Sequence, residues 1–148
     1  MRRLLVPLLV ILIGAVTLWQ QQQGPSRRAT DLPAHDIPVL VEVATGLNFA
    51  VFRVSLAGCT ESGEVLARLG EQLHFPEWFG QNWDALADCL TDFSWREAEG
   101  YVLVLEQLGD FRAAGDDDFD TLIEILSDAS ASWGVMGIPF WAFLVIEA

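Results

Sequence analysis

The chain of 148 residues contains no lysine, only eight arginines and only two histidines. Four of the arginines precede residue 29, so the chain from Asp31 onward carries four arginines against all 21 acidic residues, a net charge of 4 − 21 = −17. Such a body repels RNA, DNA and anionic lipid, whereas it attracts a basic partner. The lack of basic side chains therefore argues against direct nucleic-acid binding. Solubility alone is the other interpretation of this charge.

Cysteine is also scarce, because Cys59 and Cys89 are the only two. Two cysteines cannot build a disulfide framework, and their spacing does not suit a metal site. We expect Cys89 to be a buried thiol, since it stands beside Leu90 where a helix should turn inward. A Cys59–Cys89 bridge would require an oxidising compartment.

No calcium loop is formed by the acidic run Asp116–Asp120. Thr121 stands where the turn glycine should follow, and Ser127 stands where a bidentate acid should close the loop. We interpret the run as the acidic first turn of a helix, where carboxylates complement the helix dipole. The sequence predicts neither a metal nor a cofactor.

Near the N-terminus, the uncharged, mostly apolar run Leu4–Trp19 follows Arg2 and Arg3. This run would reach about 24 Å as a helix, whereas a bilayer core is about 30 Å thick. We interpret residues 1–19 as a short anchor in the inner membrane, with a signal peptide as the second interpretation. A start codon assigned too far upstream is the third, and it would leave the protein in the cytoplasm. Arginines on both sides of the run leave the orientation open.

Residues 20–46 are polar and contain Pro25, Pro33 and Pro38, which predicts a linker with Val39–Val43 as a candidate short strand. The remaining residues, 47–148, are predicted to be one domain. Apolar runs typical of strands alternate there with runs of helical spacing, which favours an α/β fold with a mostly parallel sheet. The predicted strands are Val51–Leu56, Tyr101–Leu108 and Pro139–Ile146, and the predicted helices are Thr60–Leu73, the segment after Asn82, and Asp117–Ala131.

The segment after Pro76 places two carboxylates one helical turn apart. Gly80 supplies a turn, and Asn82 can cap the helix that follows. Asp84 and Asp88 then share one helix face, with Cβ atoms about 6 Å apart. Like charges so placed repel, so they either form a solvated face or meet a cationic partner. The inward positions of this helix are predicted to be Trp83, Leu86 and Leu90.

The stretch "FPEWFGQNWDALADCLTDF" resembles the signature of the barstar family, small intracellular inhibitors of barnase-type ribonucleases. The similarity extends over about Val51–Ile146 in the order strand, helix, signature, strand, helix, strand. It implies the small three-layer barstar fold, with a three-stranded, mostly parallel sheet packed with helices. It also implies a binding protein rather than an enzyme, with a basic ribonuclease or related toxin as partner. The positions that fit are Pro76, Glu77, Trp78, Phe79, Gly80, Asn82, Asp84, Ala85, Leu86, Asp88, Cys89, Leu90 and Thr91.

In barstar-like inhibitors the signature helix and the loop before it cover the ribonuclease active site, and their carboxylates stand where RNA phosphates would lie. Asp128 falls where the family often has a supporting glutamate, and Ala87 replaces a tryptophan of the best-known form. The changes at Ala87 and Gln81, and the loss of two tyrosine hydroxyls, leave the identity of the target open. The partner-binding residues that the resemblance implies are Trp78, Phe79, Gly80, Asn82, Asp84, Ala87, Asp88, Thr91 and Asp128.

Other interpretations remain for the same residues. An acidic nucleic-acid mimic or another toxin-neutralising protein would use the same charge. A hydrolase with a carboxylate pair would need a cleft and two different pKa values. Asn82 could act only as a cap, and Trp78 and Phe79 suit a core and an exposed loop equally well.

Overall fold

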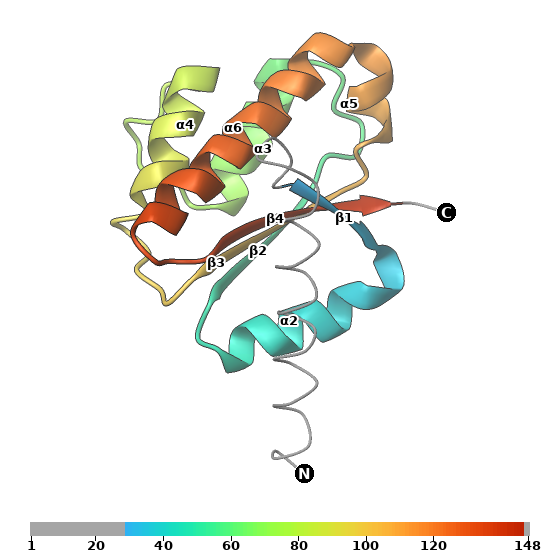
Figure 1. Cartoon of the computed structure of the whole chain (residues 1–148). Helices are drawn as coiled ribbons and strands as arrows, with labels where there is room; N and C mark the ends of the chain where they lie inside the picture. The colour runs from blue at the N-terminus through green and yellow to red at the C-terminus, as the bar shows by residue number, and fades with distance from the viewer. Residues whose placement is uncertain (1–28, 147–148) are drawn as a thin grey trace.

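The computed structural model describes residues 29–146, which form a four-stranded parallel sheet between layers of helices (Figure 1). The strand order is β1-β4-β3-β2. The strands are β1 (Ala29–Pro33), β2 (Ala50–Ser55), β3 (Tyr101–Glu106) and β4 (Phe140–Ile146). The helices are the 3-10 helix η1 (Ala34–Asp36), α2 (Ile37–Gly46), α3 (Ser62–Gln72), α4 (Trp83–Asp92), α5 (Gly109–Ala114) and α6 (Asp116–Val135).

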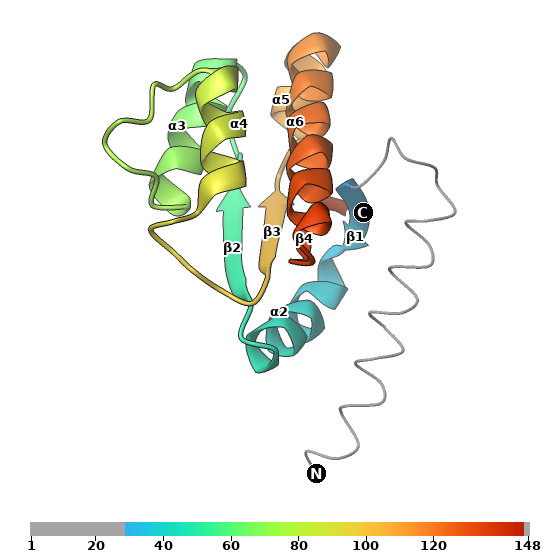
Figure 2. The same cartoon turned by 60° about the vertical axis from the view of Figure 1, so that its left-hand side comes forward.

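The handedness of the crossovers explains why both faces of the sheet are covered. From β2 to β3 to β4 the chain moves across the sheet in one direction, whereas from β1 to β2 it moves in the other. Right-handed crossovers that run in opposite directions place their helices on opposite faces. Accordingly, α2 lies on one face, and α3, α4 and α6 lie on the other (Figures 1 and 2). The predicted α/β fold with three layers is confirmed.

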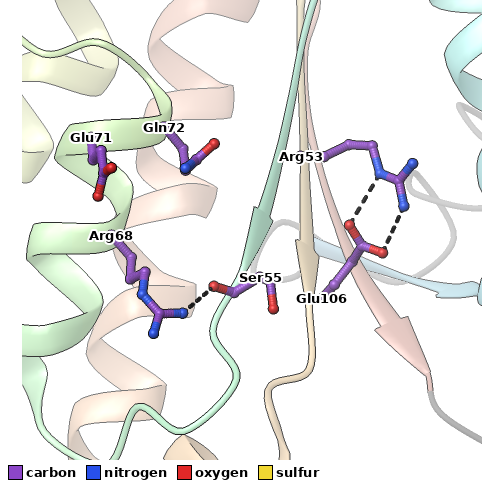
Figure 3. A pocket seen from close by; sticks show the side chains of 6 residues that line it. All are labelled: Arg53, Ser55, Arg68, Glu71, Gln72 and Glu106. Carbon is purple, nitrogen blue, oxygen red and sulfur yellow. Dashed lines mark hydrogen bonds and ion pairs between the residues drawn. The ribbon is translucent and has the colours of Figure 1, made fainter.

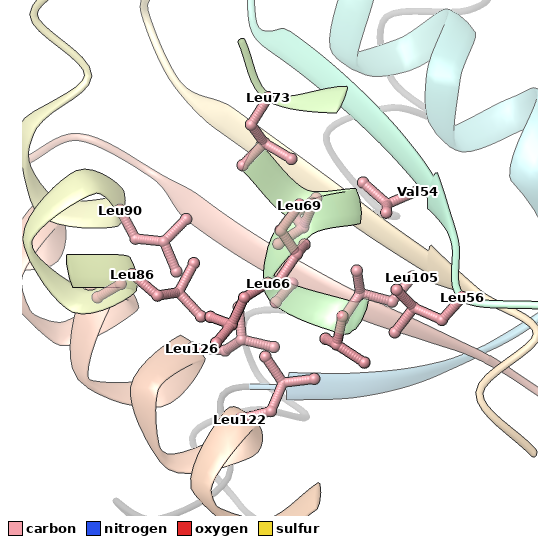
Figure 4. Packing of buried hydrophobic residues seen from close by; sticks show 14 of the residues in the cluster. Val54, Leu56, Leu66, Leu69, Leu73, Leu86, Leu90, Leu105, Leu122 and Leu126 are labelled. Atoms are coloured by element: carbon pink, nitrogen blue, oxygen red, sulfur yellow. The ribbon is translucent and has the colours of Figure 1, made fainter. Parts of the chain in front are cut away.

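Each face of the sheet has its own apolar core, and β3 contributes to both. Leu103 and Leu105 face the larger core, whereas Val102 and Val104 face the smaller one, as a strand buried on two sides requires. Figure 4 shows the larger core, where leucines of three helices point toward one another. These leucines are Leu66 and Leu69 of α3, Leu86 and Leu90 of α4, and Leu122 and Leu126 of α6.

The structure corrects the expectation for residues 29–46, which are not an irregular linker. β1 pairs in parallel with β4, so the sheet has four strands rather than three. Pro33 is the last residue of this edge strand, and edge strands are where proline is tolerated in a sheet. Residues 20–28 lie outside the described part of the chain.

Val39–Val43 belongs to helix α2 and is not a strand. Pro38 stands in the first turn, where proline is tolerated because that N–H has no partner in the helix. The buried residues Ile37, Leu40 and Ala44 follow helical spacing. Short apolar runs fit a strand and a helix equally well, and this ambiguity explains the wrong prediction of a strand.

Within residues 29–146 no helix is long and apolar enough to cross a membrane. The run Leu4–Trp19, on which the anchor and signal-peptide interpretations depend, lies outside the described residues. The inner-membrane location therefore stays a prediction.

Candidate functional site: an acidic helix and an aromatic loop

Helix α4 begins as the sequence predicts. Asn82 is the N-cap, with extended backbone angles, and its side-chain oxygen accepts a hydrogen bond from the Ala85 N–H at 2.8 Å. Such a cap satisfies one of the N–H groups that a helix start leaves free. Leu86 and Leu90 are fully buried, and Trp83 packs half-buried against the same core. The capping role of Asn82 and the inward stripe of α4 are therefore confirmed.

The other face of α4 carries exposed carboxylates. Asp84, Asp88 and Asp92 stand at successive intervals of four residues, and all three side chains are exposed. The ion pairs among residues 29–146 are His35–Asp36 and Arg53–Glu106, so none of the three has a cationic partner in the described structure. This face is therefore free to meet positive charge from another molecule.

The three carboxylates differ in what the helix itself gains from them. Asp84 stands in the first turn, where the helix dipole favours negative charge. Local stability therefore accounts in part for Asp84. Asp88 lies in mid-helix and Asp92 is the last helical residue, where the dipole disfavours an acid. Asp88 and Asp92 are thus the acids that need an explanation outside the helix.

Ala87 and Thr91 lie on the same side of α4 as Asp84 and Asp88, because positions i, i+3, i+4 and i+7 share one face. Ala87 is half-buried, and Thr91 is exposed. The Thr91 hydroxyl donates to backbone carbonyls of its own helix, with 2.9 Å between its Oγ1 and the Ala87 oxygen. Its proton is therefore occupied, and its oxygen remains able to accept a bond from a partner.

The loop before α4 contains one exposed aromatic residue, Trp78, and two packed ones, Phe75 and Phe79. Trp78 is 59% exposed. Phe79 is half-buried against Phe75, with ring centroids 4.9 Å apart. A Cβ on Gly70 of α3 would stand 3.1 Å from the Phe79 ring, so the glycine makes room for this close approach. The sequence left a core position and an exposed position open for both Trp78 and Phe79. In the structure Phe79 is packed and Trp78 is exposed.

The turn into α4 is exposed at Gly80, Gln81 and Asn82. Gln81 has a φ of 49°, in the left-handed region that residues with a Cβ seldom occupy. The Asn82 side-chain amide donates to the Gly80 carbonyl at 3.4 Å, which closes this turn. The chain therefore bends at Gln81 and Asn82, directly after Gly80, and the positive φ belongs to Gln81 rather than to the predicted Gly80.

Aromatic packing fixes the far end of α4. Phe93, the C-cap, has a φ of 47° and is only 1% exposed. Its ring stacks on Tyr101 with centroids 4.5 Å apart and an interplanar angle of 17°. The Trp133 indole of α6 donates to the Leu90 carbonyl at 2.7 Å. Helix α4 is therefore held against both the sheet and α6, which makes its outer face a rigid surface.

Cys89 lies next to Asp88 but faces the core, and it is a free, buried thiol as predicted. Burial is the main reason that the pKa of Cys89 is raised to about 11, and the charges of Asp88 and Asp92 add to this. Cys59 is also a free, buried thiol, and burial raises its pKa as well. Thiols held protonated in this way are poor nucleophiles.

Helix α6 carries the other acids that the sequence singled out. The run Asp116–Asp118 forms its first turn, which confirms the interpretation as a helix start. Asp128 is exposed on α6, which packs along α4. Among residues 29–146, Asp128 forms no ion pair with a basic side chain, and no contact between Asp128 and α4 is described. Its place beside the acidic face of α4 remains a prediction.

A hollow of about 520 Å³ lies between α3 and the edge of the sheet at β2 (Figure 3). Arg53 forms a bidentate pair with Glu106, with bonds of 2.8 and 3.1 Å, and Arg68 donates to the Ser55 carbonyl at 2.8 Å. None of the predicted binding residues lines the hollow. The exposed carboxylates of α4 therefore lie outside this hollow.

Comparison with protein families matches residues 49–145 to the barstar family, described as the barnase inhibitor. The chain belongs to the barstar family. The match covers β2 to β4 and hence all the predicted binding residues, whereas β1 and α2 precede it. Comparison with curated proteins gave no match. The family is one of ribonuclease inhibitors. The edge strand β1 lies outside the matched residues, and with it the sheet has four strands rather than the three expected.

Two residues near the site, Asp92 and Trp95, were not predicted from the sequence. Asp92 continues the row of carboxylates by one helical turn, and the spacing from Asp84 and Asp88 could have revealed it. Trp95 contacts the loop before α4 from the segment that follows this helix. No spacing in the sequence indicates that contact, because it depends on how the chain folds back.

Proposed function

We propose that the protein inhibits a basic, barnase-type ribonuclease by covering the enzyme's active site with α4 and the loop before it. The observation that carries the proposal is the row of exposed carboxylates on α4, which have no ion-pair partner among residues 29–146. An active site that binds RNA phosphates presents cationic side chains. Carboxylates form short, strong hydrogen bonds with such groups, so Asp84 and Asp88 would take the place of phosphates.

The loop contributes apolar area beside the charges. Trp78 is an exposed tryptophan in the loop that precedes the acidic helix, and tryptophan is enriched among residues that dominate binding energies. The turn at Gly80 and the exposed Asn82 present backbone and amide groups next to it. In this proposal, Trp78 anchors the contact and the carboxylates of α4 give it its specificity for a cationic site.

The small Ala87 side chain lies among the carboxylates and Thr91 on the same helix face. A partner can therefore approach the backbone of α4 more closely here than a large side chain would permit. This feature favours a ribonuclease that projects a long side chain, such as arginine, between Asp84 and Asp88.

Net charge supports the same partner. From Asp31 onward the chain carries a formal charge of −17, which attracts a basic enzyme over distances longer than direct contact. Electrostatic attraction of this kind mainly raises the association rate. The proposed inhibitor would thus find its target quickly and hold it through the α4 contacts.

The experiment is a titration of the full chain into barnase that is cleaving a fluorogenic RNA. We expect activity to fall linearly and to end near equimolar inhibitor, and an Asp84→Ala, Asp88→Ala double variant to inhibit far less. Undiminished activity at a large excess, against barnase and against other basic microbial ribonucleases, would contradict the proposal. RNA turnover by the protein itself would support an enzyme instead.

A further inference from the structure

Trp95 lies in the segment of the chain that follows α4 and leads to β3. Its side chain nevertheless contacts the connection that precedes α4 in the sequence. Its ring meets Phe75 edge to face, with centroids 5.8 Å apart, and meets Trp78 in the same way at 6.3 Å. Its indole N–H donates to the Leu73 carbonyl at 3.4 Å. All three partners belong to residues 73–82, the connection from α3 to α4 that we call the aromatic loop.

Trp95 is itself attached to the end of α4. Its ring packs against Phe93, the C-cap of this helix, with centroids 5.4 Å apart. Phe93 in turn is buried and stacks on Tyr101 of β3. The Trp95 side chain therefore bridges the segments that precede and follow α4, the helix that carries the carboxylates.

The aromatic loop has few bonds of its own at its tip. Within residues 76–82 the described hydrogen bonds are Phe79 N–H to the Pro76 carbonyl, at 3.0 Å, and the Asn82 side chain to the Gly80 carbonyl. The left-handed backbone of Gln81 adds strain in the same segment. A loop of this kind keeps one conformation only when side-chain packing holds it.

We propose that Trp95 is a positioning residue, which holds the aromatic loop, and Trp78 in it, in a fixed place relative to the acidic face of α4. The inference rests on the proposed function, because it concerns the same surface. A surface that is ordered before binding loses less conformational entropy when the partner docks. Trp95 thus raises affinity through Phe75 and Trp78, even where its own ring does not touch the partner.

The decisive test is amide hydrogen exchange of the full chain without a partner. Phe75 and Phe79 report on the loop, since their N–H groups donate to the Gly70 and Pro76 carbonyls. We expect Trp95→Leu to speed their exchange by about tenfold relative to the Tyr101 amide of the core strand β3. Trp95→Phe keeps a ring and should restore most of the protection.

Trp141→Leu is the matched control. Trp141 is also half-buried and also meets a phenylalanine edge to face, Phe49 at 5.9 Å, but it packs in the smaller core. We expect this variant to lose stability without a selective change in the loop. Unchanged exchange of the loop in Trp95→Leu would overturn the proposal. If that variant does not fold, nuclear Overhauser contacts of the Trp95 ring in the wild type decide, and their absence from Phe75 and Trp78 would overturn it.

A second readout is the dissociation rate from barnase. We expect Trp95→Leu to raise it about tenfold, a change of ~1.4 kcal/mol, while Trp95→Phe and Trp141→Leu change it little. Faster amide exchange in the loop of Trp95→Leu, together with an unaltered dissociation rate, would overturn the role of Trp95 in binding. If the wild type binds no ribonuclease, the proposed function fails, whereas the exchange experiment still decides whether Trp95 holds the loop.

Discussion

The helices on the two faces of the sheet differ in what they contribute, because one only covers the sheet whereas another also presents an acidic surface. On one face, α2 buries Ile37, Leu40 and Ala44 and precedes the part of the chain that matches the barstar family. On the other face, α4 buries Leu86 and Leu90 and also turns exposed carboxylates outward. Helix α2 closes a sheet that would otherwise expose Val102 and Val104. Helix α4 belongs to a thicker layer, which can hold an outer surface rigid enough for recognition.

Truncating one large aromatic residue on each face is the strongest way to test this difference. Phe93 and Phe143 are both almost fully buried, on the α4 and α2 sides respectively. We expect either change to alanine to cost about 3–5 kcal/mol of unfolding free energy. Only Phe93→Ala should also weaken ribonuclease binding, because Phe93 supports the end of α4. Chemical denaturation and binding at a temperature where both variants are folded would check this.

A second variant, Phe93→Gly, tests whether the backbone at this residue is strained. Phe93 occupies the left-handed region, which costs a residue with a Cβ roughly 1–2 kcal/mol. Phe93→Gly should therefore be more stable than Phe93→Ala, although glycine usually destabilises a folded chain. Greater stability of the alanine variant would show that the backbone at this position carries no strain.

Removing single exposed acids compares the two helices directly. We expect Asp88→Ala to weaken ribonuclease binding by more than ~2 kcal/mol, the usual threshold for a dominant contact. Asp84→Ala should do the same, with a small loss of stability because Asp84 also complements the helix dipole. Glu42→Ala is the control, since Glu42 is an exposed acid on α2. Titration calorimetry measures the binding free energy of each variant. Equal losses for Glu42→Ala and Asp88→Ala would mean that only the total charge matters for binding.

A salt series distinguishes the effect of the local α4 contacts on binding from the effect of the charge of the whole chain. We expect the association rate with a basic ribonuclease to fall by at least about tenfold between roughly 20 and 500 mM salt, because screening weakens long-range attraction. The dissociation rate should change less, since it depends on the close contacts. Stopped-flow mixing measures both rates. An association rate independent of salt would leave the charge of −17 with a role in solubility only.

Two glycines of α3 form a matched pair for the aromatic loop. A Cβ at Gly70 would approach the Phe79 ring to 3.1 Å, whereas a Cβ at Gly63 meets nothing within 4 Å. Gly63→Ala should gain up to about 1 kcal/mol, because alanine favours the helix. Gly70→Ala should gain less and should weaken binding by displacing Phe79 and the loop. Equal stability and equal binding for the two variants would contradict the fit of Phe79 on Gly70.

The smallest expected effect concerns the thiol beneath the acidic face. The folded pKa of Cys89, about 11, lies above the value near 8.5 for an exposed thiol. Its contribution to stability is therefore complete below pH ~8.5 and is lost as the pH rises toward ~11. Denaturation of the wild type and of Cys89→Ala at pH ~8 and ~10 should show a steeper decline in the wild type. Parallel declines would contradict the raised pKa.

Sequence patterns predicted α4 well because its signals are local. The cap at Asn82, the spacing of Leu86 and Leu90, and the buried Cys89 all follow from residues within one short stretch. Residues 29–46 were predicted wrongly for the opposite reason. An edge strand that ends in a proline and a short apolar helix have no distinctive local pattern, and their structure depends on the sheet that they join.

The aromatic loop shows the same limit at the candidate site. The sequence could not decide between a packed and an exposed position for Trp78 and Phe79. Phe79 is packed because Gly70 of α3 leaves space for its ring, and Trp78 is oriented by Trp95 beyond α4. These contacts join segments on either side of a helix, so only the folded chain reveals them.

The central claim is that Asp84 and Asp88 meet cationic side chains of a ribonuclease, and double-mutant cycles test it most directly. Each aspartate would be changed to alanine together with each active-site arginine or lysine of the ribonuclease, and the binding free energy measured for all four combinations. We expect at least one pair at each aspartate to show a coupling energy above about 1.5 kcal/mol. Coupling near zero at both aspartates would contradict the account.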